Sequence, residues 1–226
     1  MLSVKRQEIK YILTKTDSIM LQKQLSVLLE PDAFARTGYY RVRSLYYDSF
    51  ENVDYYEKIS GEEKRKKLRM RIYGNDSDTI KIELKEKDGI YQQKVSLLIS
   101  REEADCMLRS DYSFLLKRKD ECAKLFYIIA TQGAYRPAII VEYYRRAFVF
   151  PDFDTRITFD ENIRSCDGYQ NLFAKELPFI PSYMEGVVLE VKFSGVLVNS
   201  IRRILEKYLL FQVSASKYVL SRGDQL

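Results

Sequence analysis

The residues best suited to chemistry in this 226-residue chain are basic and acidic side chains that occupy alternate positions in short apolar segments. Residues 67–72 read Lys-Leu-Arg-Met-Arg-Ile, and residues 80–87 read Ile-Lys-Ile-Glu-Leu-Lys-Glu-Lys. Successive side chains of a β-strand point to opposite faces, so each segment would have one apolar face and one charged face. The same alternation recurs at residues 6–10, 156–160 and 188–193.

A solvent-exposed face is the ordinary explanation for any one of these strands, because half-buried antiparallel strands alternate in this way. Two features of the set favour binding instead. The polar positions are nearly all Lys, Arg and Glu, and cations opposite each other on neighbouring strands repel. A bound polyanion would neutralise this charge. If the sheet closes into a barrel, the charged faces would line a basic tunnel.

Carboxylates among these cations add a second kind of chemistry. Glu8, Glu83 and Glu190 each lie two residues from a lysine on the same strand face. Binding of a polyanion alone does not need them, whereas Mg²⁺ binds phosphate chains with one or two carboxylates as additional ligands. Ion pairs between the strands explain the same carboxylates equally well.

The residue types that are absent exclude several chemistries. The sequence has no histidine, which excludes a Ser-His or Cys-His nucleophile and a histidine-ligated zinc site. Cys106, Cys122 and Cys166 form no CxxC pair, so neither a disulfide framework nor a thiolate metal site is indicated. Any metal would therefore be a hard ion, Mg²⁺ or Mn²⁺, bound by carboxylates.

The overall charge and hydropathy are typical of a soluble globular protein. The net charge is +5, which is too small by itself to indicate a nucleic-acid-binding protein. The 18 tyrosines and 12 phenylalanines suit sheet packing, and no basic helix or RNA-binding signature accompanies them. No segment approaches the roughly 18 uncharged apolar residues of a membrane helix, and the charged start differs from a signal peptide. We therefore expect a cytoplasmic protein that does not bind nucleic acid.

Hydrophobic periodicity predicts an α+β fold in a single domain over residues 1–226. Apolar residues at helical spacing predict helices near residues 17–29, 112–130 and 198–209, and Ser100 with Glu103 forms a capping box that starts another. The Asp88-Gly89 pair predicts a hairpin. The expected strands are residues 4–13, 40–47, 65–73, 79–87, 91–98, 138–150, 156–160 and 187–193.

Short motifs in order along nearly the whole chain indicate a family. They are Arg6-Gln-Glu8-Ile-Lys10-Tyr11, Ser44-Leu-Tyr-Tyr-Asp48, the basic run from Lys58 through Gly61 to Arg71, Ile82-Glu-Leu-Lys85, residues 143–148, Arg156-Ile-Thr-Phe-Asp160, Leu189-Glu-Val-Lys192 and Ser216-Lys-Tyr218. Each motif alone is weak, but together they resemble the VTC domain, the polyphosphate polymerase domain of the vacuolar transporter chaperone complex. That domain belongs to the CYTH, or triphosphate tunnel metalloenzyme, superfamily.

The resemblance implies a closed antiparallel β-barrel with flanking helices, whose charged interior is a tunnel for a triphosphate or polyphosphate. It implies that Glu190, with Glu8 and Glu83, binds Mn²⁺ or Mg²⁺. Arg145 is favoured over its neighbour Arg146, which faces the opposite way. The implied catalytic phosphate contacts are Lys10, Arg69, Arg71, Lys85, Arg145 and Lys217, and further phosphate-binding residues of the tunnel wall are Lys58, Arg65, Lys67, Arg156 and Lys192.

The implied reaction is transfer of the ATP γ-phosphate to a growing polyphosphate chain, with ATP and polyphosphate as substrates. Cations would neutralise the oxygens of the transferred group, and the tunnel would hold donor and acceptor in line. Two alternatives remain: hydrolysis of inorganic triphosphate or a nucleoside triphosphate in the same tunnel, and a non-catalytic polyphosphate-binding module. The sequence leaves open a membrane-protein partner, the oligomeric state and the metal preference.

Overall fold

The computed structural model describes residues 6–35, 38–74, 79–89, 91–182, 185–208, 210–214 and 216–223, which belong to two compact units. The first unit comprises Met1–Arg41, Tyr143–Ile163 and Tyr183–Ser216, and the second comprises Val42–Glu142, Arg164–Ser182 and Lys217–Leu226. Each unit combines strands with helices, which confirms the α+β class. The single domain expected over residues 1–226 stays a prediction.

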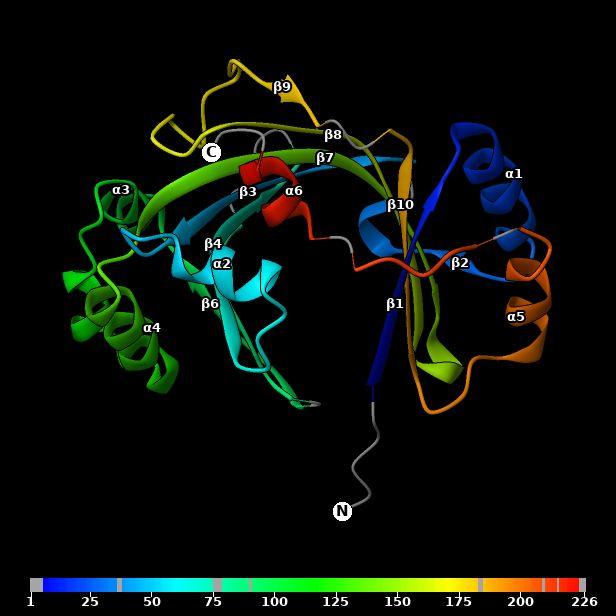
Figure 1. Cartoon of the computed structure of the whole chain (residues 1–226), viewed down its shortest axis with the longest axis horizontal. Coiled ribbons are helices and arrows are strands. Elements are labelled where there is room, and N and C mark those ends of the chain that lie inside the picture. Colours follow the sequence, from blue (N-terminus) through cyan, green and yellow to red (C-terminus); the bar gives the residue numbers. More distant parts are fainter. Residues whose placement is uncertain are drawn as a thin grey trace. The chain divides into compact units, whose positions relative to one another are not determined.

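The strands form a ten-stranded sheet with the order β1-β10-β8-β7-β3-β4-β5-β6, and the short strands β2 and β9 pair with β7 and β8 (Figure 1). The pairs whose registers are defined are antiparallel. The strand bounds are β1 (Arg6–Leu13), β2 (Glu30–Pro31), β3 (Tyr40–Asp48), β4 (Arg65–Tyr73), β5 (Ile80–Asp88), β6 (Tyr91–Ile99), β7 (Arg136–Phe150), β8 (Thr155–Asp167), β9 (Ile180–Pro181) and β10 (Val187–Ser194).

The closed barrel expected from the motifs is not formed by these strand pairings. β1 and β6 stand at the two ends of the strand order, and within the described residues no ladder joins them. β1 pairs with β10, and it also meets the segment of residues 210–214, where Tyr11 bridges Gln212 and the Lys10 carbonyl accepts from the Val213 N–H over 2.9 Å. This segment takes up backbone groups of β1 that closure would need. The antiparallel sheet is therefore confirmed, and the closure of its edges is not.

Short helices accompany the strands in both units. Across the described parts of the chain, no helix is long and apolar enough to cross a membrane. The helices are α1 (Lys15–Leu25), α2 (Val53–Ile59), α3 (Arg101–Leu108), α4 (Glu121–Gln132), α5 (Asn199–Leu205) and α6 (Lys217–Gly223), with 3₁₀ helices η1 (Ala33–Ala35), η2 (Ser113–Lys117) and η3 (Pro151–Phe153).

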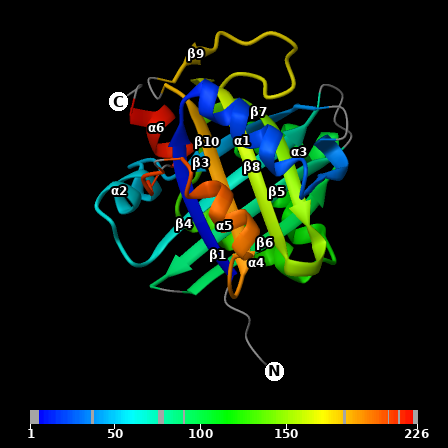
Figure 2. The ribbon, with the colours of Figure 1, turned by 90° about the vertical axis from the view of Figure 1, so that its right-hand side faces the viewer.

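The first unit packs α1 and α5 side by side against one face of its strands (Figure 2). The Thr14 hydroxyl caps α1 by accepting a hydrogen bond from the Asp17 N–H. Leu21, Leu25 and Ile201 are the fully buried helix residues of this core. The alternating strand positions that meet them are Phe148, Ile157, Phe159, Leu189, Val191 and Phe193. The charged positions between them therefore point to the opposite face of the strands.

The second unit buries the apolar face of β4, β5 and β6 against α3 and α4. The predicted capping box starts α3: the Ser100 hydroxyl accepts from the Glu103 N–H, and the Glu103 carboxylate accepts from the Ser100 N–H. Ala104, Met107 and Phe126 pack from the helices. The strands contribute Leu68, Met70, Ile72, Ile82, Leu84, Leu97 and Ile99.

A buried ion pair between Arg43 and Glu142 holds the segment that follows β8 against the sheet of the second unit. Arg43 of β3 and Glu142 of β7 are 1% and 0% exposed, and Arg43 Nε donates to Glu142 Oε2 over 2.6 Å. Arg43 Nη1 also donates to the carbonyls of Leu172 and Ala174 over 2.8 and 2.6 Å. Arg164 Nη2 donates to Glu142 Oε1 over 2.5 Å. The guanidinium of Arg43 thus holds the segment after β8 in place.

Replacing Arg43 with methionine is expected to lower the free energy of unfolding by roughly 2–4 kcal/mol, because the change removes the guanidinium that donates to the Leu172 and Ala174 carbonyls and to the buried Glu142 carboxylate. Chemical denaturation measures the loss. The exposed pair of Lys64 and Asp88, 3.6 Å apart, supplies the control, since Lys64→Met should cost much less. Equal losses in the two variants would contradict the role given to Arg43.

A second buried carboxylate lies on α2 and carries an altered pKa. Asp54 is 1% exposed, its Oδ1 accepts from the Tyr135 hydroxyl over 2.6 Å, and Lys66 Nζ lies 3.6 Å from the same oxygen. Asp54 Oδ2 is buried without a hydrogen-bond partner in the described structure. Burial raises the pKa of Asp54 from 3.8 to about 7 although the Tyr135 hydrogen bond lowers it, and the neighbouring Asp48 carboxylate raises it further.

This pKa predicts that the protein loses stability as the pH rises from about 4 to 7. Between these pH values the folded state keeps a proton on Asp54 that the unfolded state has already released. The free energy of unfolding therefore falls by roughly 2–4 kcal/mol over this range, and the effect of Asp54 is constant above pH 7. Asp54→Asn should flatten the decline, measured as melting temperature against pH. Asp88→Asn, at an exposed carboxylate, should keep it. Parallel pH profiles for wild type and Asp54→Asn would refute the assignment.

Candidate functional site

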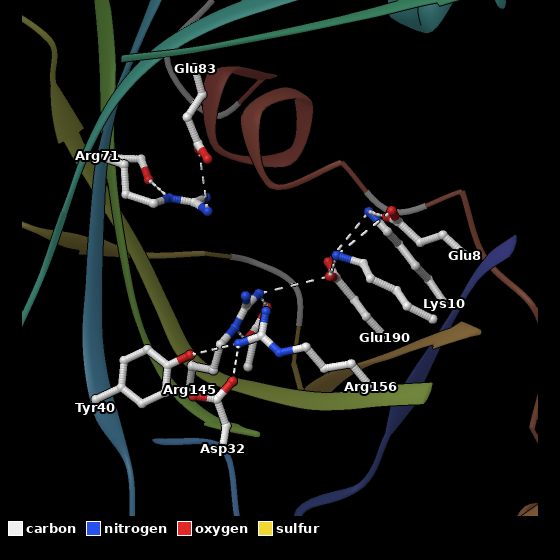
Figure 3. Close-up of polar contacts among 12 residues, drawn as sticks. Glu8, Lys10, Asp32, Tyr40, Arg71, Glu83, Arg145, Arg156 and Glu190 are labelled. Atoms are coloured by element: carbon white, nitrogen blue, oxygen red, sulfur yellow. Dashed lines mark hydrogen bonds and ion pairs between the residues drawn. The ribbon is translucent and has the colours of Figure 1, made fainter. Parts of the chain in front are cut away.

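The polar face of the first unit brings together six of the predicted site residues on β1, β10, β8 and β7 (Figure 3). The antiparallel register places Lys10 opposite Glu190 and Glu8 opposite Lys192. It also places Arg156 opposite Lys192 on the other side of β10. The six residues are Glu8, Lys10, Arg145, Arg156, Glu190 and Lys192, which we call the first-unit cluster.

Two carboxylates share two lysines in this cluster. Lys10 Nζ lies 3.2 Å from Glu8 Oε1 and 3.4 Å from Glu190 Oε1. Lys192 Nζ lies 3.8 Å from Glu8 Oε2 and 3.3 Å from Glu190 Oε2. Glu190 is the more buried of the two carboxylates, with 7% of its side chain exposed against 23% for Glu8. The two acids are therefore surrounded by lysines on adjacent strands.

Arg145 is fixed by a carboxylate that the sequence alone did not pair with it. Its Nε and Nη2 donate to the two oxygens of Asp160 over 2.6 and 2.7 Å, and Nη2 lies 3.8 Å from Glu190 Oε2. Arg146 turns the other way: its guanidinium lies over the Phe148 ring, and Nη1 donates to Gln22 Oε1. Arg145 is therefore the arginine of the cluster, as the motif spacing favoured.

Arg156 has two partners that sequence reasoning missed. Its Nη2 lies 2.7 Å from Asp32 Oδ2 and donates to the Tyr40 hydroxyl over 3.3 Å (Figure 3). Asp32 follows β2, which pairs with β7, so the sheet rather than a sequence motif brings it to Arg156. No local pattern around Asp32 predicts this contact.

The electrostatics of the first-unit cluster favour added negative charge. Burial lowers the pKa of Lys192, and the nearby cations Arg145 and Lys10 act in the same direction, while Glu190 and Glu8 oppose them. Burial also disfavours the charged form of Arg145, but Asp160 and the other anions outweigh it, so the pKa of Arg145 lies well above its ordinary value. An added phosphate would strengthen the charged form of Lys192.

The second unit carries its own cationic face, centred on Glu83 of β5 (Figure 3). Arg69 Nε lies 2.7 Å and Arg71 Nη1 3.6 Å from Glu83 Oε2, and Lys94 Nζ pairs with Glu83 Oε1. Glu83 is 2% exposed. Burial opposes its ionisation, but Arg69, Arg71 and Lys94 outweigh burial and hold the pKa of Glu83 well below its usual range.

Lysines stand opposite one another beside this group. The register places Lys67 opposite Lys85 on β4 and β5, and Lys85 opposite Lys94 on β6. Like charges at directly opposed positions destabilise a sheet, so this row also favours a bound anion. Of the other predicted phosphate contacts, Lys58 lies on α2, Lys217 on α6, and Arg65 begins β4 with its Nη1 donating to the Glu62 carbonyl.

The first-unit carboxylates fit a divalent metal only together with phosphate oxygens. No group of three or more His, Cys, Asp or Glu residues in the described chain could hold a metal by itself. Mg²⁺ and Mn²⁺ often use one or two carboxylates and complete their coordination with substrate phosphate and water. Lys10 and Lys192 each contact both Glu190 and Glu8, so these two carboxylates lie in one place and would serve as such a pair once phosphate offsets the lysine charge. Glu83 contacts Arg69, Arg71 and Lys94 in the other unit. The roles of Glu8, Glu83 and Glu190 as metal ligands stay predictions.

The fold and the charged faces define an α+β protein whose antiparallel sheet presents clustered cations and carboxylates. The family model of the VTC domain matches residues 5–222, so the chain belongs to the VTC domain family. A protein of Bacillus halodurans, proposed to be an adenylate cyclase, shares the fold: its structure has 14% sequence identity and a TM-score of 0.55, with 94% of this chain and 95% of that chain covered.

A structure from Vibrio parahaemolyticus, also proposed to be an adenylate cyclase, is 12% identical with a TM-score of 0.44, and covers 90% of this chain and 84% of that chain. No curated protein matches the sequence. Membership of the VTC domain family supports a triphosphate-tunnel enzyme, as the sequence motifs predicted.

Proposed function

We propose that this protein is a metal-dependent phosphotransferase that transfers the γ-phosphate of ATP to the end of a polyphosphate chain. One observation carries the proposal: the nearly buried carboxylate of Glu190 lies within 3.8 Å of Lys10, Lys192 and Arg145. A site that only neutralises a polyanion gains nothing from a carboxylate among its cations. A site that binds a phosphate chain through a metal ion needs one.

In this proposal the first-unit cluster binds and orients phosphate. Lys10, Lys192 and Arg156 contact phosphate oxygens, and Arg145, held by Asp160, presents its remaining N–H groups in a fixed direction. Glu190, with Glu8 beside it, holds Mn²⁺ or Mg²⁺. When bound, the metal neutralises the phosphate charge that grows in the transition state. A guanidinium that a carboxylate already holds in place needs little reorganisation energy during the reaction.

The cationic face of the second unit binds phosphate in the same way. Arg69 and Arg71 supply planar guanidinium groups, and Lys67, Lys85 and Lys217 supply compact ammonium charges. An ionised oxygen of the terminal phosphate of the polyphosphate chain attacks the γ-phosphorus of ATP, the bond from that phosphorus to the β–γ bridging oxygen breaks, and ADP leaves. Because the attacking oxygen is already ionised, no histidine is required as a base. ATP and polyphosphate are therefore the substrates of the proposed reaction.

Incubation of the purified protein with ATP and Mn²⁺, followed by ³¹P NMR, tests this function. We expect the signal of mid-chain polyphosphate to grow with time and to vanish when a chelator removes the metal. Release of free phosphate alone would replace the polymerase with a triphosphatase that uses water as the nucleophile. Tight binding of added polyphosphate without turnover of ATP would leave a non-catalytic binding module.

A further inference from the structure

Tyr218 of α6 is hydrogen-bonded to a buried carboxylate of the second unit. Its hydroxyl donates a hydrogen bond to Asp48 Oδ2, and both residues are 1% exposed. Tyr218 directly follows Lys217, one of the predicted phosphate contacts. A hydrogen bond at this position therefore restrains the backbone that carries Lys217.

Asp48 is itself held by the backbone of the segment that leads into α2. Its Oδ1 accepts from the N–H groups of Ser49 and Asp54 over 2.7 and 2.9 Å, and its Oδ2 accepts from the Tyr55 N–H over 3.0 Å. The bonds from Asp54 and Tyr55 satisfy N–H groups of the first turn of α2, which have no partner inside the helix. Asp48 is thus a rigid acceptor for Tyr218.

The ring of Tyr218 stacks on an aromatic neighbour of a phosphate contact. The ring centroids of Tyr218 and Tyr46 are 5.2 Å apart with an interplanar angle of 25°. The Arg69 guanidinium lies 5.9 Å from the centroid of Tyr46, and Arg69 Nη1 donates to the Tyr46 hydroxyl over 3.4 Å. Tyr46 therefore contacts both Tyr218 and Arg69.

The charge of Lys217 also lowers the pKa of Tyr46. Burial opposes ionisation of Tyr46, but Arg69, Arg71 and Lys217 outweigh burial and lower the pKa of Tyr46. The Lys217 ammonium therefore belongs to the group of cations around Tyr46, although it comes from the far end of the sequence.

Arg222 anchors the other end of α6. Its Nη2 donates to Asn52 Oδ1 over 3.0 Å, and its Nη1 donates to the Ala138 carbonyl over 3.3 Å. A helix of seven residues is too short to be stable by itself, so its position depends on such anchors. Tyr218 is the anchor next to Lys217.

We propose that Tyr218 is a positioning residue: its hydrogen bond to Asp48 and its stacking on Tyr46 hold Lys217 beside Arg69, so that both side chains bind the same triphosphate. The inference rests on the proposed function, because it takes Lys217 and Arg69 as phosphate contacts. Tyr218 itself does not touch the phosphate; it acts through Lys217.

A double-mutant cycle with tripolyphosphate as the probe tests this role. Tyr218→Phe keeps the ring and removes the hydroxyl that donates to Asp48. Calorimetry should show that Tyr218→Phe and Lys217→Ala each weaken binding by about five- to tenfold, and that the double variant is no weaker than Lys217→Ala alone. Losses that multiply in the double variant would overturn the proposal, since Tyr218 would then act independently of Lys217.

Tyr112→Phe is the matched control for lost stability. The Tyr112 hydroxyl is also buried in the second unit and donates to the Tyr135 carbonyl over 2.7 Å. We expect this variant to lower the melting temperature as Tyr218→Phe does, but to keep wild-type affinity for tripolyphosphate. An equal loss of affinity in Tyr112→Phe would overturn the positioning role, because general destabilisation would then explain both variants.

Hydrogen exchange of the α6 amides separates failure of this inference from failure of the proposed function. Tyr218→Phe should speed exchange in α6 without any ligand present, whereas Tyr112→Phe should not. If α6 exchanges faster in Tyr218→Phe but Lys217→Ala binds tripolyphosphate with wild-type affinity, Lys217 does not contact phosphate. Both its role in the proposed site and the positioning role of Tyr218 would then be wrong. If Lys217→Ala weakens binding while Tyr218→Phe changes neither exchange nor affinity, only the positioning role falls.

Discussion

Replacing Arg69 and Arg71 together with glutamine is expected to weaken tripolyphosphate binding at least about 100-fold. A charge-assisted hydrogen bond contributes roughly 1.5–3 kcal/mol, and a tenfold change in affinity corresponds to about 1.4 kcal/mol. Both side chains lie on the charged face of β4, where they reach Glu83 over 2.7 and 3.6 Å. Calorimetric titration with tripolyphosphate, without metal and with Mn²⁺, measures the loss.

Glu83 decides how this variant should be built. Its buried carboxylate keeps Lys94 as a partner but loses both guanidinium groups, so the double variant should melt at a lower temperature. Adding Glu83→Gln should recover stability without recovering affinity, because it removes the unpaired charge and supplies no cation. Charge reversal would instead place new carboxylates against Glu83 and confuse binding with folding.

Arg118→Gln is the control for the loss of an ion-paired arginine elsewhere in the second unit. Arg118 Nη1 and Nε lie 2.7 and 2.8 Å from Glu103 and Asp120. This variant should bind tripolyphosphate with wild-type affinity. The phosphate role of Arg69 and Arg71 would be wrong if their folded double variant also bound as tightly as wild type.

The alternation of charged and apolar residues predicted most of the strands, because it reports directly on which side chains face the core. The capping box at Ser100 likewise placed the start of α3. The helix expected over residues 112–130 is wrong in its first half: the chain forms η2 and then α4, with Arg118 between them. Apolar spacing continues across this break, whereas the hydrogen bond from Arg118 to Glu103 of α3 that accompanies it depends on the tertiary structure.

Two short helices were missed because their anchors come from elsewhere in the chain. α2 is capped by Asp48 of β3, and α6 is held through Tyr218 and Arg222. Neither helix has a long apolar stripe of its own. Helices of this length depend on tertiary contacts, so periodicity within the segment carries little signal.

For the candidate site, the sequence predicts which side chains share one face of a strand, but not which residues of other strands lie beside them. Alternation placed Lys10 and Glu190 on charged faces, and the spacing of the family motif favoured Arg145 over Arg146. The partners of the arginines depend on which residues stand opposite or nearby in the folded sheet. Arg145 therefore meets Asp160, and Arg156 meets Asp32, through contacts that no local pattern encodes.

Glu190→Gln is expected to lower the affinity for Mn²⁺ at least about tenfold and to abolish most metal-dependent turnover, because a neutral amide oxygen is a much weaker ligand for a hard divalent cation. Binding of tripolyphosphate without metal should be retained or become tighter. Lys10, Lys192 and Arg145 lose a carboxylate that lies 3.3–3.8 Å away, so more of their charge is available to phosphate. Electron paramagnetic resonance follows Mn²⁺, calorimetry follows tripolyphosphate, and ³¹P NMR follows turnover.

Asp32→Asn separates metal ligation from a simple change of net charge. It removes one negative charge from the same unit, at a carboxylate 2.7 Å from Arg156 and outside the shared Glu8 and Glu190 group. If Glu190 is a ligand, Mn²⁺ affinity falls in Glu190→Gln and not in Asp32→Asn, while both variants retain metal-free binding of tripolyphosphate. Unchanged Mn²⁺ affinity in Glu190→Gln would make this carboxylate a structural partner of Lys10 and Lys192. The carboxylate of Glu190 among its cations would then no longer support metal-dependent phosphate transfer.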